Sequence, residues 1–506
     1  MKFIAYDLGT GGIKASLYDE KLNTIEKTFI EYSTYYPKDG YHEQRPEDWW
    51  QAVIESTTEL LQKTKVDPSE IACVSLSGHS LVTVPIDAEG ELLSEFVPIW
   101  SDSRAVSEAQ QFFQRIDEEK WYLTTGNGFP APLYSVFKLM WLKENQPDIF
   151  KQIYKILGSK DYINYRLTGN FYTDHSYASG FGVYNLNENE LEKQFLDVAG
   201  IPEAIFPEIV NSHFIVGKIT KEAAKLTGLP EGTSVACGGV DNACMALGAV
   251  GAEEGAVYLS LGSSSWIAVN SEKPMLDYKT KPYVFVHIQE NMYTSAYSIF
   301  SAGSSLTWVR DTICQEIEDT KNAYRIIDEL ALQSPPGSND VVFNPSLAGG
   351  TSQDKSVNIR GAYLGLGLGT SKSDILRATL EGIAMNLKLS YNQIAEKVEL
   401  SKNLLICGGG SKSKIWLQMF ADIFNVNIIK TNIDQDAASL GAAAISAKAM
   451  GLWDDYSQIK QLHQVEHTLS PDINNSGKYN LLEKRFTYIA EMLSDYGDYF
   501  NRDQLY

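Results

Sequence analysis

The amino-terminal segment alternates between short apolar runs and tight turns. Apolar runs over residues 3–6 and 13–18 flank the turn Gly9-Thr10-Gly11-Gly12, whose glycines allow the backbone to reverse sharply. We therefore expect a β-hairpin at the start of the chain, followed by a third strand over residues 24–32.

A helical pattern follows this hairpin. Pro46, Glu47 and Asp48 favour a helix start, because proline fits the first turn and acidic side chains complement the helix dipole. The expected buried stripe of this helix is Trp50, Val53, Ile54, Thr57 and Leu61. A buried strand is predicted over residues 71–77, with a continuation over residues 81–86. Three antiparallel strands, a helix and a further strand are the order of a ribonuclease-H-like domain.

The second half of the chain repeats this scheme. Residues 256–270 again form a strand, a turn at Gly262-Ser-Ser-Ser265 and a strand, and two further strands are expected near residues 284–288 and 292–298. A long helix is predicted to begin near Asp374. Beyond it we expect strands over residues 403–407 and 427–429 and helices through Trp416 and from Asp436.

Two similar halves predict an α/β protein built from two ribonuclease-H-like domains with a cleft between them. We place the domains at residues 1–247 and 248–506. Residues 100–235 are mixed and loop-rich, and we interpret them as an insertion that builds a pocket wall.

Composition narrows the class of protein. The 506 residues are 44% hydrophobic, which is enough for large cores, and the net charge of −21 without a lysine or arginine cluster argues against a nucleic-acid partner. Five scattered cysteines without metal-ligand spacing predict buried thiols in a reducing cytoplasm. The first strand begins at residue 3, so we expect no signal peptide, and no apolar run is long enough for us to expect a membrane span.

Asp7 lies at the strand end that faces the first turn. Glycine turns let backbone amides approach an anion, and a carboxylate beside a phosphate repels it unless a cation lies between them. The hairpin therefore favours a Mg²⁺–nucleotide site, and the alternative is an aspartate that caps its own turn. The second copy of the hairpin, at Gly262, favours the nucleotide interpretation.

Longer motifs carry a resemblance to a known family. Gly361-Ala-Tyr-Leu-Gly-Leu366, seven further residues and Asp374-Ile-Leu-Arg-Ala-Thr-Leu-Glu381 fit the carboxy-terminal signature of the FGGY carbohydrate kinases. Ser135-Val-Phe-Lys-Leu-Met-Trp141 fits the amino-terminal signature except at its first position. Shorter matches are Thr125-Gly-Asn, Lys160-Asp-Tyr, Leu167-Thr-Gly, Gly238-Gly-Val-Asp-Asn242 and Leu261-Gly-Ser. Over nearly its whole length the chain resembles this family, and its xylulokinases in particular.

The resemblance implies an ATP- and Mg²⁺-dependent sugar kinase and assigns roles to single residues. Asp241 would be the general base that accepts the proton of the sugar hydroxyl, and Asp7 would organise Mg²⁺ through water. The sugar would be held by His79, Asp102, Arg104, Asp241 and Asn242 in the first domain. The phosphates would contact Gly9, Thr10 and Lys14 on one side and Gly262, Ser263 and Ser264 on the other. The adenosine would be bordered by Gly408, Gly409 and Ser411.

The segment after the fourth strand does not decide between the sugar substrates of the family. Xylulokinases usually carry Gly-Gln-Met-His-Gly after the fourth strand, whereas this chain has Ser77-Gly-His-Ser-Leu81, so His79 falls in a different register. Gluconate kinases of the family show a similar His-Ser-Leu, but at a different distance from the following aspartate. Xylulose is the lead substrate, followed by ribulose, fuculose, gluconate and erythritol-like polyols.

Simpler interpretations exist for several of these residues. Asp241 could cap a helix, Arg104 could be a surface charge, His79 could be a core histidine, and Lys14 could decorate an exposed strand face. At the level of function, the alternatives are a non-catalytic, nucleotide-gated sugar sensor and an actin-like polymerising ATPase. We expect a small-molecule sugar as partner, no nucleic acid and no membrane, and the resemblance is compatible with a homodimer.

Overall fold

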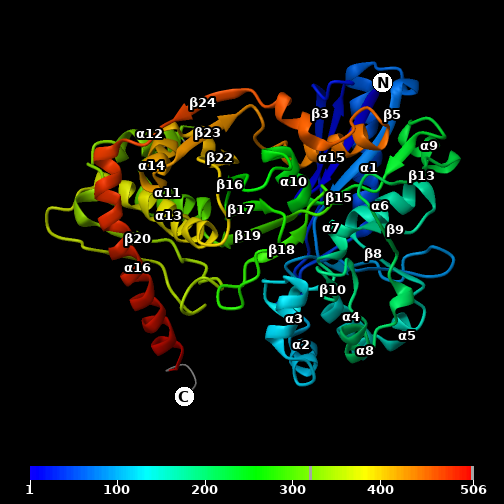
Figure 1. The fold of residues 1–506 in the computed structure, drawn as a ribbon, viewed down its shortest axis with the longest axis horizontal. Coiled ribbons are helices and arrows are strands. Elements are labelled where there is room, and N and C mark those ends of the chain that lie inside the picture. The colour runs from blue at the N-terminus through cyan, green and yellow to red at the C-terminus, as the bar shows by residue number, and fades with distance from the viewer. Residues whose placement is uncertain (318, 320–321, 503–506) are drawn as a thin grey trace. The chain divides into compact units, whose positions relative to one another are not determined.

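The computed structural model describes residues 1–317, 319 and 322–502. The chain forms two compact units, each assembled from three segments. The first contains residues 1–252, 272–294 and 436–462, and the second contains residues 253–271, 295–435 and 463–506. Each unit has its own β-sheet with helices packed on it (Figure 1).

The first unit is built on a sheet whose strand order is β13-β14-β5-β1-β2-β3, with β15 paired to β5. β1, β2 and β3 are antiparallel neighbours, and β5 runs parallel to β1. The bounds are β1 Lys2–Leu8, β2 Gly12–Tyr18, β3 Thr24–Glu31, β5 Ile71–Gly78, β13 Ile215–Lys218, β14 Ser234–Ala236 and β15 Gly239–Val240. The predicted hairpin, third strand and buried strand are therefore confirmed.

Helix α1 (Pro46–Thr64) packs on β2 and β3, and it begins with the predicted proline and acidic first turn. Trp49, Trp50 and Val53 of this helix share one hydrophobic core with Ile4 and Tyr6 of β1. The Tyr6 hydroxyl also lies 2.5 Å from the Thr57 hydroxyl, which fixes the helix on the sheet.

The strand predicted over residues 81–86 is shorter than expected. Only β6 (Val84–Ile86) is extended, and it pairs with β8 (Lys155–Leu157) instead of continuing the main sheet. The physical reason is Leu81, whose φ of 60° lies in the left-handed region that a leucine rarely adopts. This turn redirects the chain directly after His79.

Residues 100–235 fold mainly into short helices within the first unit, with a few two- to four-residue strands. The helices are α2 Val106–Phe113, α3 Glu118–Thr125, α4 Ser135–Asn145, α5 Pro147–Phe150, α6 Ser159–Thr168, α7 His175–Ala178, α8 Lys193–Ala199 and α9 Lys221–Thr227. The short strands include β9 (Tyr172–Asp174) and β12 (Glu208–Val210), which pair in parallel.

Two helices from distant parts of the sequence meet in the first unit. α10 (Asp241–Val250) packs against α15 (Ala437–Ala449), and α15 also packs against β1 and β5 (Figure 1). The Tyr18 and Ser439 hydroxyls lie 2.9 Å apart and link α15 to β2. Close approach requires glycine here, because a Cβ at Gly441 would lie 2.0 Å from the Cys244 carbonyl oxygen.

The second unit repeats the strand order of the first, as β19-β17-β16-β22-β23-β24. β16 and β17 are antiparallel, and β22 and β23 continue the sheet in parallel beside β16. The bounds are β16 Val257–Leu261, β17 Ser265–Ser271, β19 Tyr293–Ile299, β22 Asn403–Cys407, β23 Asn427–Thr431 and β24 Val465–Leu469. The strand before β19 is β18 (Tyr283–Val286), so all four strands predicted between residues 256 and 298 are confirmed.

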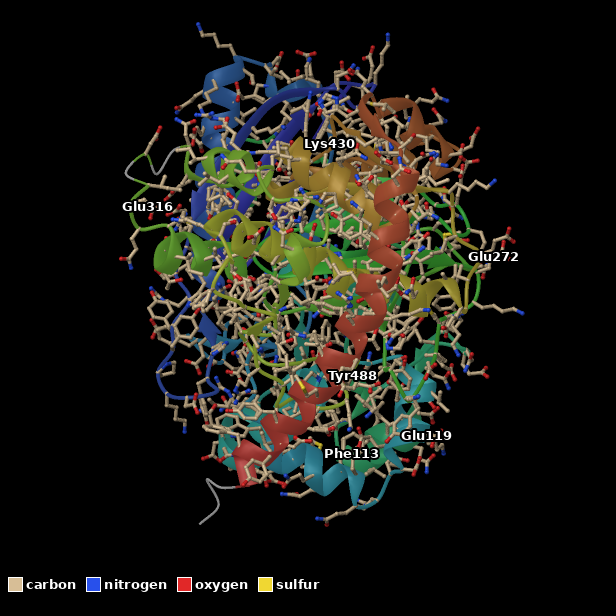
Figure 2. The ribbon with its side chains drawn as sticks, turned by 90° about the vertical axis from the view of Figure 1, so that its left-hand side faces the viewer. Phe113, Glu119, Glu272, Glu316, Lys430 and Tyr488 are labelled. Carbon is tan, nitrogen blue, oxygen red and sulfur yellow. The ribbon has the colours of Figure 1, made fainter. Side chains whose placement is uncertain are left out.

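The helices of the second unit also fit the predicted pattern. α13 (Lys372–Ala395) begins at a Ser371 cap, and α14 (Lys414–Phe424) follows the glycine turn after β22. α11 (Gly303–Ile313) and α12 (Ala323–Ala331) precede them. The last helix, α16 (Ile473–Arg502), packs on α13 and α14, and Figure 2 shows it as one long helix carrying Tyr488, which is exposed.

The five cysteines are all buried and unpaired with one another, as predicted. Within the part of the chain that the structure describes, no helix has the length and apolar character needed to cross a bilayer.

Candidate active site

The first hairpin forms a tight turn between β1 and β2. The Gly9 amide donates to the Gly12 carbonyl at 3.0 Å, and the Tyr32 hydroxyl donates to the Gly9 carbonyl at 2.5 Å. Thr10 is held at two points, because its carbonyl accepts from Gln44 at 2.7 Å and its hydroxyl oxygen accepts from the Trp100 indole at 2.9 Å. Gly12 is required by space, since a Cβ there would lie 2.5 Å from the Ile30 carbonyl oxygen. Hydrogen bonds from Tyr32, Gln44 and Trp100 therefore hold the turn.

Asp7 lies half-buried at the end of β1, directly opposite Lys14 of β2. The Ser77 hydroxyl donates to its Oδ1 at 2.9 Å. Burial raises the pKa of Asp7, and the nearby Lys14 ammonium partly offsets the shift. Lys14 itself forms an ion pair with Asp436 at 3.2 Å, so the exposed-strand interpretation of this lysine is wrong.

Asp241 is the first residue of α10, and Val240 occupies the N-cap position. The Asp241 side chain accepts from the backbone and side-chain amides of Asn242, at 2.8 and 3.0 Å. It does not cap the helix, so the N-cap interpretation is wrong. Burial raises the pKa of Asp241 to about 7, and the negative charge of Asp7 contributes to the shift. The structure thus brings the predicted base and the predicted metal carboxylate within electrostatic reach of one another.

His79 follows β5 and is only 2% exposed. Its ring packs edge-on against Trp49, and its Nδ1 lies 3.2 Å from the Leu8 carbonyl oxygen. A carbonyl can only accept, so Nδ1 carries the proton and Nε2 is left as an acceptor. Nε2 is buried without a hydrogen-bond partner among the described residues. Burial lowers the pKa of His79 to about 4, which keeps the ring neutral near pH 7.

Asp102 and Arg104 form a buried ion pair. The Asp102 side chain is fully buried, and its oxygens accept from the Arg104 guanidinium at 2.9 and 2.7 Å and from the His42 amide at 2.8 Å. Arg104 also contacts Glu43 at 2.6 Å and stacks on Tyr41. The surface-charge interpretation of Arg104 is therefore wrong, and Asp102 fixes the guanidinium in place.

Lys138 connects the loops that carry His79 and Arg104. Its ammonium donates to the Leu81 carbonyl at 2.9 Å and to the Ile99 carbonyl at 2.6 Å. Burial lowers the pKa of Lys138 to about 7. Arg104, Lys138 and Trp141 line one cavity of about 300 Å³. Lys138 lies inside the signature segment 135–141, but sequence reasoning gave it no role, because only the fold shows which carbonyls it reaches.

The second hairpin lies at the end of β16 in the second unit. Ser263 and Ser264 are exposed, and Gly262 is half-buried. The Gly262 and Ser263 carbonyls accept from the first amides of α11, at 2.9 Å from both Gly303 and Ala302. These bonds tie the turn to the start of α11.

The glycine turn after β22 lies beside the second hairpin, because β22 runs parallel to β16. Gly408, with a φ of 91°, donates to Asp434 at 2.7 Å, and a Cβ there would lie 2.8 Å from the Leu261 carbonyl oxygen. The Ser411 hydroxyl is buried and donates back to the Gly408 carbonyl at 2.7 Å, whereas a Cβ at Gly409 would meet nothing within 4 Å. Ser411 therefore shapes the turn, and Gly409 leaves space beside it.

The residues of the first unit fit a divalent cation. Carboxylates are the ligands that Mg²⁺ prefers, and Asp7 and Asp241 place two carboxylates within electrostatic reach of one another, with the Lys14 ammonium close to Asp7. No cluster of three or more histidine, cysteine or carboxylate side chains was found among the described residues, so phosphate and water would supply the remaining ligands. Sequence reasoning missed Ser77 and Asp436, the partners that orient Asp7 and Lys14.

Two sheets of ribonuclease-H-like order, each with a phosphate-type hairpin at its first strand, define the class that contains actin-like ATPases and sugar kinases. The comparisons with known proteins narrow this class. Residues 2–248 match the amino-terminal domain, and residues 257–450 the carboxy-terminal domain, of the FGGY family of carbohydrate kinases. The chain belongs to this family and is a sugar phosphotransferase, as the sequence motifs indicated.

Individual relatives are similar over nearly their whole length. The xylulose kinase of Bacillus subtilis is 31% identical over 95% of this chain and 95% of the relative. The structure of a ligand-bound xylulose kinase from Lactobacillus acidophilus aligns with a TM-score of 0.91, at 27% identity and 99% coverage of both chains. A gluconate kinase structure from the same organism aligns equally well, with a TM-score of 0.91 and 27% identity over 99% of both chains.

Proposed function

We propose that this carbohydrate kinase transfers the γ-phosphoryl group of ATP to a hydroxyl group of a ketose, with xylulose as the lead substrate. The similarity to the xylulose kinase of Bacillus subtilis supports this choice. Gluconate is the second candidate, because the gluconate kinase structure aligns equally well and His79-Ser80-Leu81 is similar to the segment found in gluconate kinases.

The observation that carries the proposal is the burial and the raised pKa of the Asp241 carboxyl. A sugar hydroxyl is a weak nucleophile while it keeps its proton, and a carboxylate within hydrogen-bond reach orients it and accepts the proton. A general base works best when its pKa lies near the working pH, and burial beside Asp7 raises the pKa of Asp241 to about 7. Asp241 at the start of α10 therefore fits the role of the base.

The neighbouring residues divide into sugar and phosphate contacts. His79 Nε2 would accept a hydrogen bond from a sugar hydroxyl, Asn242 would contact a second hydroxyl, and Arg104 would be aimed by Asp102. In the first unit, Gly9, Thr10 and Lys14 would contact phosphate oxygens and Asp7 would hold Mg²⁺. Bound Mg²⁺ would neutralise phosphate charge. In the second unit, Gly262, Ser263 and Ser264 would contact phosphates, and Gly408 and Gly409 would border the adenosine.

Release of ADP across a panel of sugars tests the proposal. The panel contains xylulose, ribulose, fuculose, gluconate and erythritol, and the highest kcat/KM is expected for xylulose. A higher kcat/KM for gluconate would show that gluconate and not xylulose is the preferred substrate, and the kinase activity itself would stand. Binding of sugar and nucleotide without turnover of any member would favour the sensor instead.

A further inference from the structure

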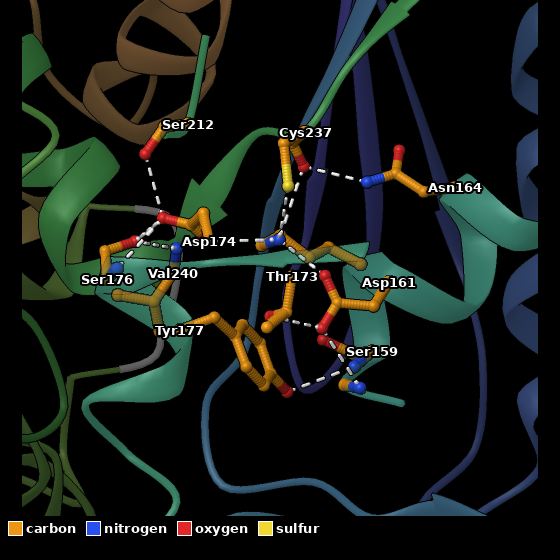
Figure 3. Close-up of polar contacts among 12 residues, drawn as sticks. Ser159, Asp161, Asn164, Thr173, Asp174, Ser176, Tyr177, Ser212, Cys237 and Val240 are labelled. Atoms are coloured by element: carbon orange, nitrogen blue, oxygen red, sulfur yellow. Dashed lines mark hydrogen bonds and ion pairs between the residues drawn. The ribbon is translucent and has the colours of Figure 1, made fainter. Parts of the chain in front are cut away.

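A buried charge cluster lies behind the strand-to-helix turn that carries Asp241. The Lys160 ammonium lies 2.5 Å from Asp161 Oδ1 and 3.0 Å from Asp174 Oδ1, and all three side chains are completely buried (Figure 3). Burying three charges costs desolvation energy, so buried ion clusters are weak evidence for stability and suggest another role. None of these residues has a part in the proposed phosphoryl transfer.

The cluster contacts the turn at its first residue, Cys237. The Lys160 ammonium donates to the Cys237 carbonyl at 3.3 Å, and the Asn164 amide donates to the same oxygen at 2.8 Å (Figure 3). Asp161 is fixed in turn by the Gly158 amide and the Thr173 hydroxyl, at 3.2 and 2.8 Å. The Lys160–Asp161 pair is therefore bonded to the turn at Cys237 and to the segments that carry Gly158 and Thr173, all in the first unit.

A second contact reaches the residue directly before Asp241. The Ser176 hydroxyl donates to Asp174 Oδ2, and the Val240 amide donates to the Ser176 oxygen at 3.0 Å (Figure 3). Gly239 permits this approach, because a Cβ there would lie 3.1 Å from the same serine oxygen. A chain of polar contacts thus runs from Lys160 through Asp174 and Ser176 to the N-cap residue of α10.

The same cluster also holds the main chain of His79. The His79 carbonyl accepts from the Ser159 and Tyr177 hydroxyls, at 2.8 and 2.9 Å, and the Lys160 ammonium lies 5.4 Å from the centre of the Tyr177 ring. The main chain of His79 and that of Val240, the residue before Asp241, are thereby held by one buried centre.

We propose that Ser176, held by Asp174 and Lys160, is a positioning residue that sets the orientation of Asp241. This inference rests on the proposed function, because it assigns Ser176 a part in the same reaction. Ser176 acts only through the Val240 amide and touches neither sugar nor nucleotide.

The chain offers a matched control. Ser212, like Ser176, donates its hydroxyl to Asp174 Oδ2, at 2.8 Å, but it contacts the 237–241 turn through its backbone carbonyl, which accepts from the Gly238 amide at 3.0 Å and is kept in an alanine variant. Ser176→Ala and Ser212→Ala therefore each remove one buried hydroxyl from the same carboxylate, and only Ser176→Ala removes the contact to Val240.

Kinetics separate the two serines. A small misplacement of a reacting group lowers the rate strongly, so Ser176→Ala should lower kcat by about tenfold or more while the KM values for sugar and ATP stay within about twofold. Ser212→Ala should keep kcat within about twofold of the unchanged protein. Equal kcat values in the two variants, or a loss in Ser176→Ala that appears only in KM, would overturn the proposal.

Hydrogen exchange tests the anchor without relying on turnover. In the full-length protein, Ser176→Ala should speed amide exchange in peptides covering residues 237–242, and Ser212→Ala should not. Unchanged exchange in both variants would also overturn the proposal. If the unchanged protein turned over no sugar, the proposed function would fall, and the exchange comparison would still decide whether Ser176 fixes this turn.

Discussion

Asp241 combines two properties that pull in opposite directions. Its burial beside Asp7 disfavours the charged carboxylate, yet the charged form is the one that accepts a proton. Burial and the charge of Asp7 raise the pKa of Asp241 to about 7, so the protonated carboxyl and the carboxylate are both populated near neutral pH. Its hydrogen bonds from Asn242 hold the side chain in one orientation while it changes charge.

Replacing Asp241 by asparagine tests the base directly. Asp241→Asn keeps the shape of the side chain but cannot accept the proton, so kcat should fall by roughly 10²–10⁴-fold while the KM for ATP changes little. Steady-state kinetics with the best sugar of the panel measure both constants. A fully active Asp241→Asn variant would remove the residue from the mechanism.

The pH dependence of this residue has a definite sign. Because the pKa of Asp241 is raised from 3.8 to about 7, kcat/KM for the sugar should rise with pH through a midpoint near 7. The free energy of unfolding changes in the opposite direction. The Asp241 carboxyl loses its proton at a lower pH in the unfolded chain than in the folded protein, so its raised pKa lowers the stability as the pH rises from about 4 to 7. At pH 8 Asp241→Asn should melt no lower than the unchanged protein. Burial lowers the pKa of Lys138 to about 7 as well, so the Asp241→Asn variant is needed to assign the kinetic midpoint to Asp241.

His79 gives a prediction about substrate affinity. Its unpartnered Nε2 is a neutral acceptor, and loss of one hydrogen bond of this kind costs about 0.5–1.5 kcal/mol. His79→Ala should therefore raise the sugar KM by roughly two- to tenfold and leave the ATP KM nearly unchanged. Equal increases for both substrates would indicate that His79 only supports the core around Trp49.

At the scale of elements, the pair α10 and α15 determines where Asp241 lies. The two helices cross at glycines, because a Cβ at Gly248 would lie 1.8 Å from the Ala437 carbonyl oxygen and one at Gly441 would lie 2.0 Å from the Cys244 carbonyl oxygen. Backbone atoms cannot yield as side chains do, so even one added methyl group separates the helices.

Gly441→Val should accordingly destabilise the protein by about 1–3 kcal/mol, the usual cost of overpacking, and lower activity with it. Chemical denaturation and sugar turnover measure the two effects. Gly477→Ala is the control, because a Cβ there meets nothing within 4 Å and alanine suits a helix better by about 1 kcal/mol. A Gly441→Val variant as stable as the Gly477→Ala control would contradict the close crossing.

At the scale of the whole molecule, the two units share one strand order, β3-β2-β1-β5-β14 in the first and β19-β17-β16-β22-β23 in the second. In each, a glycine-containing turn joins the first two antiparallel strands, at Gly9–Gly12 and at Gly262–Ser264. The repeat places one candidate phosphate turn in each unit, and the position two residues before the first glycine is Asp7 in the first unit and Ser260 in the second.

Turnover should depend on both a nucleoside triphosphate and a divalent cation. Asp7 and Asp241 place two carboxylates within electrostatic reach of one another, so a phosphate close to them needs a cation to offset the repulsion. ADP release should vanish when EDTA exceeds Mg²⁺ and return when Mg²⁺ is restored. Full activity in excess chelator would contradict the metal role of Asp7.

Much of this fold follows from local patterns in the sequence. The strands around Gly9 and Gly262 and the helices at Pro46 and Asp374 were predictable, because hydrophobic period and glycine turns act over short distances. The left-handed backbone of Leu81 was not predictable, because leucine rarely adopts this conformation and its segment contains no residue pattern that predicts it. Asp7, His79 and Asp241 came from motifs, whereas Lys138 and Ser176 work through carbonyls and amides that only long-range packing brings near.

Residues 436–462 belong to the first unit although they are synthesised after most of the second, and this order affects folding during synthesis. Domains usually fold as they leave the ribosome, but the first unit lacks α15 until residues 253–435 have been made. At about 5–20 residues per second, this delay lasts roughly 10–40 s. During it the apolar surface of β1 and β5 that packs on α15 is open to other nascent chains. We therefore expect ribosome-bound chains that end before residue 436 to recruit chaperones, and a chain released there to aggregate.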